Sequence, residues 1–173
     1  MTRYISQGIT LIEMMIVIVI LSILLAIAVP NFSNLILSNQ ISSNASDFVD
    51  SLRLAKKEAN ARRTTVIVCI RQGNACSTNA ATGWNNGWIV FLDANGNNTV
   101  DNGETIYEYQ ALDPRITFTA ADINGGALGI LSFTPSGNTN LTGSGAATFT
   151  LSNQDGTISR GIRVTVAGHA SPL

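Results

Sequence analysis

The sequence predicts an α+β fold in which one long N-terminal helix, membrane-spanning at first and then amphipathic, packs against antiparallel β-sheets. Three observations lead to it. Residues 9–29 are almost uninterruptedly apolar. Beyond them, apolar residues recur at spacings of three and four as far as Ala59. From Thr64 onward, short β-branched and aromatic runs alternate with turn residues. We therefore expect one globular domain carried on a helical appendage.

The first apolar segment is long enough to cross a bilayer, which takes about 20 residues of helix. Between Leu11 and Val29 the only polar side chains are Glu13 and Ser22. Arg3 lies in the short leader, residues 1–8, and the next basic residue is Arg53. This bias places the N-terminus in the cytoplasm. We expect a single-pass inner-membrane protein whose C-terminal domain lies in the periplasm.

The helix is expected to continue through residues 30–63. Pro30 should kink or loosen it without dividing it into two domains. Its end is expected near Arg62 or Arg63. There, a cluster of basic residues complements the helix dipole. The cluster consists of Lys56, Lys57, Arg62 and Arg63.

Residues 64–173 are expected to form the β-rich domain. Asn-Gly, Asp-Gly and Gly-Gly turns separate its strand-like runs and favour antiparallel hairpins. Trp84, Trp88 and Phe91 are expected in the core, because large aromatics in strands mostly supply buried area. The runs are 65–70, 87–92, 105–109, 116–119, 129–133, 147–151 and 162–166.

Two cysteines lie close together, Cys69 and Cys76. An exported chain meets an oxidising compartment, where such a pair usually closes. Two thiols without nearby His or Cys partners do not complete the four ligands usual for zinc. We therefore expect a hairpin disulfide between Cys69 and Cys76.

The junction of leader and apolar segment reads Gly8-Ile9-Thr10-Leu11-Ile12-Glu13. It resembles the type III signal of the type IV pilin superfamily, in which a basic leader ends in Gly and a hydrophobic residue, Thr-Leu and Glu follow. The resemblance implies that prepilin peptidase cuts after Gly8 and that the new amine of Ile9 is methylated. The chain departs from most relatives at Ile9, where they have Phe.

Glu13 is a carboxylate inside an apolar segment, where it costs about 2.5–3.5 kcal/mol on insertion scales. Such a residue is a functional candidate by default. In the superfamily, this Glu pairs with the N-terminal amine of a neighbouring subunit. The resemblance therefore implies that Glu13 draws the subunit into a growing filament. The alternative is a protonated Glu at the membrane interface without a role.

The second half of the chain narrows the resemblance to the GspH/FimT/FimU group of pseudopilins and minor pilins. The segments that carry it are 55–59 with Arg62-Arg63, 84–93, 102–104 and 133–137. It implies a pilin-like fold and a minor subunit that joins other pilins or pseudopilins through its N-terminal helix. An inner-membrane platform assembles such filaments, and minor subunits initiate or cap them at the tip. A type IV pilus and a type II secretion pseudopilus both remain open, because both use this leader, helix and sheet.

Oxygen-bearing side chains recur in the loop from Asp93 to Glu104 with the spacing of an EF-hand calcium loop. Asn98 replaces the usual Gly at the sixth position, and the loop joins expected strands rather than helices. A solvated turn is the alternative to a calcium site, and no other cofactor is expected. The candidate ligands are Asp93, Asn95, Asn97, Thr99, Asp101 and Glu104.

DNA is an alternative partner, because some FimT-type pilins bind it through Gly-Arg-x-Arg near the C-terminus. The matching segment here, residues 168–171, lacks both arginines. Arg160 and Arg163 are the nearest candidates, and they need the helix cations beside them to hold phosphates. The net charge of −1 does not predict a general polyanion binder.

No enzymatic motif occurs in the sequence. The single histidine, His169, lies in an expected tail, and no nucleophile elbow or phosphate-binding loop is present. We therefore expect a structural subunit rather than an enzyme. A single-pass membrane protein unrelated to filaments is the alternative outside the superfamily.

Overall fold

The computed structural model describes residues 9–141 and 145–173, apart from the side chains of residues 27–31. The chain forms two compact units, Met1–Asn39 and Gln40–Leu173, whose boundary falls within the long helix. The elements are α1 (Leu11–Arg62), β1 (Thr65–Gln72), β2 (Ala75–Ser77), η1 (Ala80–Thr82), η2 (Trp84–Asn86), β3 (Trp88–Asp93), β4 (Thr105–Tyr109), β5 (Ile116–Asp122), β6 (Ile130–Phe133), β7 (Ala146–Asn153), β8 (Ser159–Thr165) and β9 (Ala170–Pro172).

Helix α1 is one continuous element of 52 residues. Pro30 lies within it and does not end it, as expected. The helix ends at Arg62, and Arg63 follows with a φ of 52°. A left-handed residue directly after the last helical turn is a common way to end a helix.

Over residues 9–141 and 145–173, none of the helices combines the length and the hydropathy of a membrane span. The membrane span expected over residues 9–29 includes residues 27–29, whose side chains the structure does not describe. This span stays a prediction.

The strands form two antiparallel sheets, as the turn residues predict. Sheet A has the order β2-β1-β3-β4, and β6 also pairs with β1. Sheet B has the order β5-β7-β8-β9. Each of the seven expected runs contains a strand, whereas β2 and β9 were not expected. His169 lies in the turn before β9, where its carbonyl accepts a hydrogen bond from Thr165 N, so its placement in a tail was wrong.

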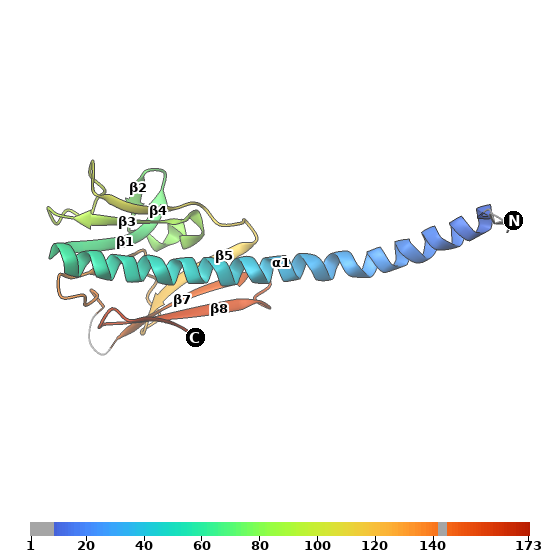
Figure 1. Ribbon diagram of the computed structural model, residues 1–173. Helices are drawn as coiled ribbons and strands as arrows, with labels where there is room; N and C mark the ends of the chain where they lie inside the picture. The colour runs from blue at the N-terminus through green and yellow to red at the C-terminus, as the bar shows by residue number, and fades with distance from the viewer. Residues whose placement is uncertain (1–8, 142–144) are drawn as a thin grey trace, which may run out of the picture. The chain divides into compact units, whose positions relative to one another are not determined.

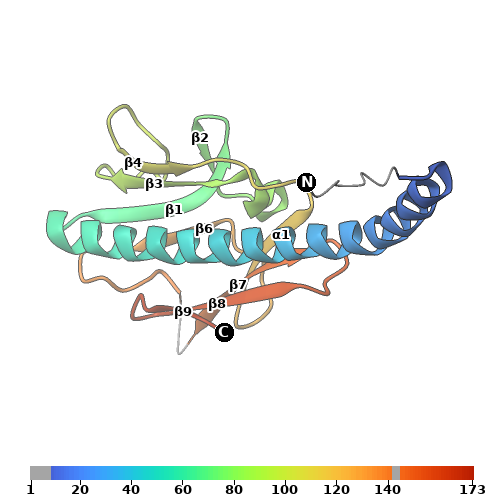
Figure 2. The same cartoon turned by 45° about the vertical axis from the view of Figure 1, so that its right-hand side comes forward.

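In the globular unit, Gln40–Leu173, the helix lies between the two sheets. Figure 1 shows β1 and β3 on one side of it and β7 and β8 on the other. Figure 2, turned by 45°, shows the same arrangement and places β9 beside β8. One residue of the helix contacts both sheets.

Phe48 is that residue. It is fully buried, and its ring packs edge-on against Trp88 of β3 and Phe118 of β5, with centroids 5.0 Å away in both pairs. The ring of Phe149 on β7 lies 4.8 Å away. Trp84 and Trp88 are core residues, as expected. Edge-to-face aromatic pairs add about 0.5–1.5 kcal/mol each beyond the area they bury.

A second apolar cluster covers the outer face of sheet A. It consists of Ile67, Cys69, Ile89 and Phe91, with Val100 and Ile130 packed against it. The cluster explains why five consecutive residues of β1, 66–70, are buried, since apolar groups cover both faces of this strand. Val100 belongs to the loop between β3 and β4, so packing fixes this loop onto the sheet.

A polar clamp ties β4 to the helix. The ring of Tyr109 stacks on Trp88 at 4.1 Å. Its hydroxyl donates to Asp47 Oδ2 at 2.9 Å and lies 3.1 Å from Asn44 Oδ1. Burial and the Asp47 carboxylate raise the pKa of Tyr109 to about 12. Trp88 Nε1 in turn donates to Ser51 Oγ on the same helix, at 2.9 Å.

The clamp predicts a stability loss for Tyr109→Phe. We expect the free energy of unfolding to fall by about 1–2 kcal/mol, because the variant lacks a hydrogen bond to a carboxylate. The folded-state pKa lies above the ordinary value of 10.0. The stability it provides is therefore complete below pH 10 and is lost as the pH rises towards about 12. Denaturant unfolding across this range measures both effects, and the Tyr109→Phe variant should lack the alkaline loss that the wild type shows.

The control is Tyr107→Phe, on the same strand with its side chain 40% exposed. It should keep both the stability and the alkaline loss. Equal effects of the two substitutions would contradict the clamp.

Candidate functional site

The start of α1 is a capping box. Thr10 precedes the first helical residue, and its Oγ1 accepts a hydrogen bond from Glu13 N at 3.3 Å. The Glu13 carboxylate returns to Thr10, where Oε2 accepts from the backbone N and from Oγ1, both at 3.2 Å. This reciprocal Thr-x-x-Glu arrangement satisfies two backbone donors at the helix start. The carboxylate also complements the positive end of the helix dipole.

The residues expected for processing, Gly8 and Ile9, come directly before this box. Ile9 lies one residue before the cap, and its side chain is 74% exposed. Gly8 and the rest of the expected leader lie outside the described residues. The capping box holds the Glu13 carboxylate against the backbone N of Thr10, the residue next to Ile9. Glu13 is therefore placed to interact with a positive charge at the start of the helix.

The following helical turns are apolar and exposed. Between Leu11 and Leu25 the large apolar side chains are 51% to 79% exposed. Ser22, the polar residue among them, is satisfied internally, because its Oγ donates to Val19 O at 2.7 Å. A soluble monomer rarely presents a contiguous apolar surface of this kind, which marks contact with a partner or a membrane.

The expected disulfide is present. Cys69 on β1 is bonded to Cys76 on β2, with Cα atoms 5.7 Å apart. Gly73 makes the turn between these strands with a φ of 65°. The bond pins the short strand β2 to the edge of sheet A beside the outer cluster.

Loss of the disulfide should destabilise the globular unit. For the double variant Cys69→Ser/Cys76→Ser we expect the free energy of unfolding to fall by about 2–3 kcal/mol, since a short closed loop constrains the unfolded chain. Denaturant unfolding with and without reductant measures this loss. Reductant should lower the wild type to the level of the variant and leave the variant unchanged; a reductant effect on the variant would contradict the assignment.

The calcium candidates lie in the β3–β4 loop and are hydrogen-bonded to one another. Asp101 Oδ2 accepts from the side-chain amides of Asn95 at 2.8 Å and Asn97 at 2.9 Å. The Glu104 carboxylate accepts from the backbone N of Asp101 at 3.1 Å and of Ala94 at 3.3 Å. A calcium ion would have to replace these hydrogen bonds.

The backbone of this loop agrees with one part of the calcium pattern. Asn98 takes the left-handed conformation expected at the sixth position, with a φ of 57°. Asp93 is buried at the end of β3, and its Oδ1 accepts a hydrogen bond from Asn98 N. Asn97 Oδ1 accepts a hydrogen bond from Thr99 N, so both side chains already have partners in the loop. Within the part of the chain described, no group of three or more Asp, Glu, His or Cys residues is arranged to hold a metal ion. Calcium binding stays a prediction.

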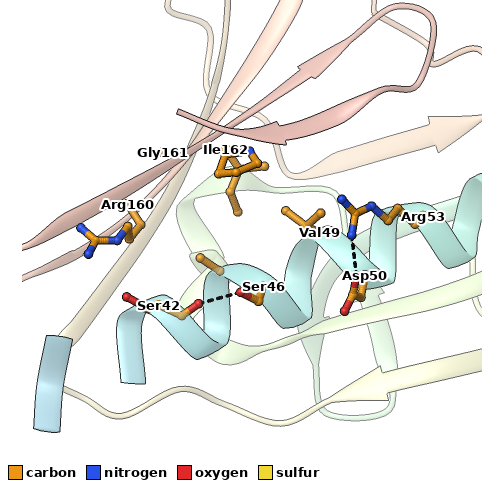
Figure 3. Close-up of a pocket in the computed structure, with 10 residues that line it drawn as sticks. Ser42, Ser46, Val49, Asp50, Arg53, Arg160, Gly161 and Ile162 are labelled. Atoms are coloured by element: carbon orange, nitrogen blue, oxygen red, sulfur yellow. Dashed lines mark hydrogen bonds and ion pairs between the residues drawn. The ribbon is translucent and has the colours of Figure 1, made fainter. Parts of the chain in front are cut away.

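The two DNA candidates do not form one patch. Arg160 and Arg163 are both exposed on β8, but three positions apart in a strand they point to opposite faces of sheet B. Arg160 lines a groove of ≈ 330 Å³ between α1 and β8, together with Ser42, Ser46 and Arg53. Figure 3 shows Arg160 and Arg53 at the two ends of this groove. DNA binding therefore stays a prediction, and only Arg160 lies near the helix cations.

The sequence reading missed two features of the globular unit. One is the clamp of Tyr109 on Asp47, 62 residues apart. The other is Tyr107, which stays exposed on the outer strand of sheet A. The alternation of Thr105, Tyr107 and Tyr109 along the strand indicates that they share one face of the sheet. It does not indicate which element packs against that face.

Comparisons with known proteins agree with this geometry. Residues 44–168 match the family model described as "Type II transport protein GspH", and residues 4–29 match the "Prokaryotic N-terminal methylation motif". No curated protein sequence matches the chain.

Two solved structures are similar in fold. The type IV minor pilin FimU of Pseudomonas aeruginosa is 18% identical with a TM-score of 0.55, over 77% of this chain and 87% of that one. The minor pseudopilin EpsH from the type 2 secretion system of Vibrio cholerae is 12% identical with a TM-score of 0.53, over 78% and 96% of the two chains. Both likenesses concern the fold alone.

Proposed function

This chain belongs to the GspH family of type II transport proteins, whose members are minor pilins and pseudopilins, and from that premise we propose that it helps to initiate or cap a type IV pilus or type II secretion pseudopilus. The observation that carries the proposal is a capping-box carboxylate at the start of an exposed apolar helix. The partners are other pilins or pseudopilins, the prepilin peptidase and an inner-membrane platform.

Before assembly, the apolar surface of residues 9–29 lies in the inner membrane with the globular unit in the periplasm. Removal of residues 1–8 leaves a positive amine at Ile9, next to the positive end of the helix dipole. Glu13 offsets both charges through the box with Thr10. Methylation of the Ile9 amine replaces one N–H with a methyl group and leaves the positive charge in place.

On assembly, the apolar side chains exchange lipid for the helices of neighbouring subunits. Glu13 then exchanges its hydrogen bond with Thr10 for the amine of a neighbour. An unpaired carboxylate in an apolar filament core is costly, so only a subunit in the correct axial register is stable there.

Processing supplies the first test. The native protein should start at a methylated Ile9, as read from its intact mass and N-terminal sequence in cells that contain prepilin peptidase. In a Gly8→Val variant, the bulky side chain should block cleavage, and the chain should start at Met1. A matched Ser6→Val variant, two residues away in the leader, should be processed normally. An uncut wild-type chain would defeat the proposal.

Glu13→Gln supplies the second test. The amide keeps the size and one hydrogen-bond acceptor but loses the charge that pairs with an amine. We expect normal cleavage and a loss of incorporation into filaments of at least about tenfold, the cost of one charge-assisted pair. Quantitative immunoblotting of sheared filaments against membranes measures it. Ser22→Ala, elsewhere in the segment, should incorporate normally, and equal incorporation of Glu13→Gln would contradict the role of the charge.

A further inference from the structure

Strand β4 is an uncovered edge of sheet A. It is the last strand in the order β2-β1-β3-β4, and none of its five residues is buried (Figure 2). Residues 126–128 lie along β5 and residues 138–140 along β6, where they make backbone hydrogen bonds. The other edge strands, β2 and β9, have three residues each. A free sheet edge presents backbone N–H and C=O groups that can pair with a strand of another chain.

The hydrogen-bonding pattern of sheet A shows which backbone groups of β4 are free. Leu92 N donates to Glu104 O at 2.9 Å, so the even-numbered residues of β3 turn their backbone groups towards β4. Their partners in the register are Tyr107 and Tyr109. Glu108 lies between these two and therefore turns its N–H and C=O to the outer edge, where no described strand pairs with them.

A trough runs between this edge and helix α1. It consists of two adjoining hollows of ≈ 410 Å³ and ≈ 210 Å³ that share Tyr107. Residues 107–113 line one side, and residues of α1 from Gln40 to Leu54 line the other, in the opposite chain direction. From Gln40 to Leu54 the helix rises about 21 Å, which is the length of about six residues of extended chain. The trough therefore has the length of one added strand.

The carboxylates that line the trough all have partners within the subunit. Asp47 accepts a hydrogen bond from the Tyr109 hydroxyl at 2.9 Å. Among the described residues, no basic side chain lines either hollow. A partner in the trough is therefore recognised by its backbone and its shape rather than by its net charge. The other three carboxylates form ion pairs: Asp50 with Arg53, Glu108 with Arg71 and Asp113 with Arg115.

One polar atom of a residue at the end of the trough lacks a partner. Gln40 Oε1 is buried, and no described residue donates a hydrogen bond to it. A buried acceptor without a donor is destabilising. Because Gln40 lines the trough, a turn about its last side-chain torsion, which is soft in Gln, would bring Oε1 within reach of a donor placed there.

We propose that an extended segment of a different pilin or pseudopilin subunit adds to β4 as a further strand, pairs with the backbone of Glu108 and donates a hydrogen bond to Gln40. The segment has about six residues, carries no net charge and packs a β-branched or aromatic side chain on the exposed ring of Tyr107. The inference rests on the proposed function, which supplies the partner subunits. A strand edge accepts one neighbour, which agrees with a minor subunit that initiates or caps a filament.

Photocrosslinking in cells that contain the filament system tests the proposal. The full-length chain carries benzoylphenylalanine at Ala111, an exposed residue of the trough, and mass spectrometry identifies the crosslinked peptide. We expect crosslinks to an extended segment of a different pilin or pseudopilin. The same label at Ile123, which is exposed outside the trough, is the matched control and should not give this product. Detergent extracts at low and high salt should give equal yields, because paired charges do not drive the contact.

Two variants test the contacts themselves. Proline at position 108 lacks the outward N–H, but the ladder to β3 does not use this group, so the strand should still form. The crosslink yield of Glu108→Pro should fall at least about tenfold below that of Glu108→Ala, which loses the same carboxylate and keeps the N–H. Gln40→Leu should lower the yield about threefold without lowering the melting temperature of the free chain, because it removes the acceptor that has no donor there.

Three outcomes overturn the proposal. They are the absence of a crosslink from Ala111, a crosslink to a second copy of this chain, and a yield for Glu108→Pro or Gln40→Leu equal to that of its reference, Glu108→Ala or the wild type. Cleavage after Gly8 is read from the same samples. An uncut leader defeats the proposed function, whereas a cut chain that enters filaments without the crosslink overturns this inference alone, so the two failures are distinguishable.

Discussion

The contact of Phe48 with both sheets is the constraint on which the globular unit depends. Its ring contacts aromatic residues of β3, β5 and β7, so one helical side chain packs against both sheets, which share no strand pairing. Such a residue cannot be reduced in size without loss, since removing a buried Phe costs about 3–5 kcal/mol. The helix is therefore a structural part of the core and not only an anchor for it. The hydrogen bonds from Trp88 to Ser51 and from Tyr109 to Asp47 fix its rotation against sheet A.

The two halves of the same helix differ in how far their apolar side chains are exposed. From Ile41 to Ala59 its apolar residues are buried inside the globular unit, apart from the half-buried Leu54. From Leu11 to Leu25 they are exposed, and the hydrophobic effect, about 25 cal/mol per Å² of apolar surface, favours their burial elsewhere. The only charged residue from Leu11 to Leu25 is Glu13, which the capping box engages. Within one subunit, the Glu13 carboxylate stabilises the start of the helix through Thr10. In the proposed assembly, it can exchange that hydrogen bond for a stronger interaction with a neighbouring subunit.

The outer face of sheet A is covered by local structure. The disulfide and the β3–β4 loop cover the outer face of sheet A, where Val100 and Ile130 complete a small second core. That packing gives the acidic loop a structural role whether or not it binds an ion.

Local features of this protein were determined by the sequence. The end of α1 at Arg62, the seven expected strands and the Cys69–Cys76 bond depend on neighbours a few residues apart. The Thr10 and Glu13 box has the same local character. The short strands β2 and β9 escaped prediction, because strands of three residues carry too little pattern and are held by a disulfide or a hairpin partner.

Long-range features were decided by the tertiary structure. The division of the strands into two sheets, and the pairing of β1 with β6, join segments with no periodicity in common. Tyr109 meets Asp47, and Arg160 lines the same groove as Arg53, only because the sheets close around the helix. Side-chain periodicity fixes which face of an element is apolar, but the free energy of packing whole elements together decides which faces meet.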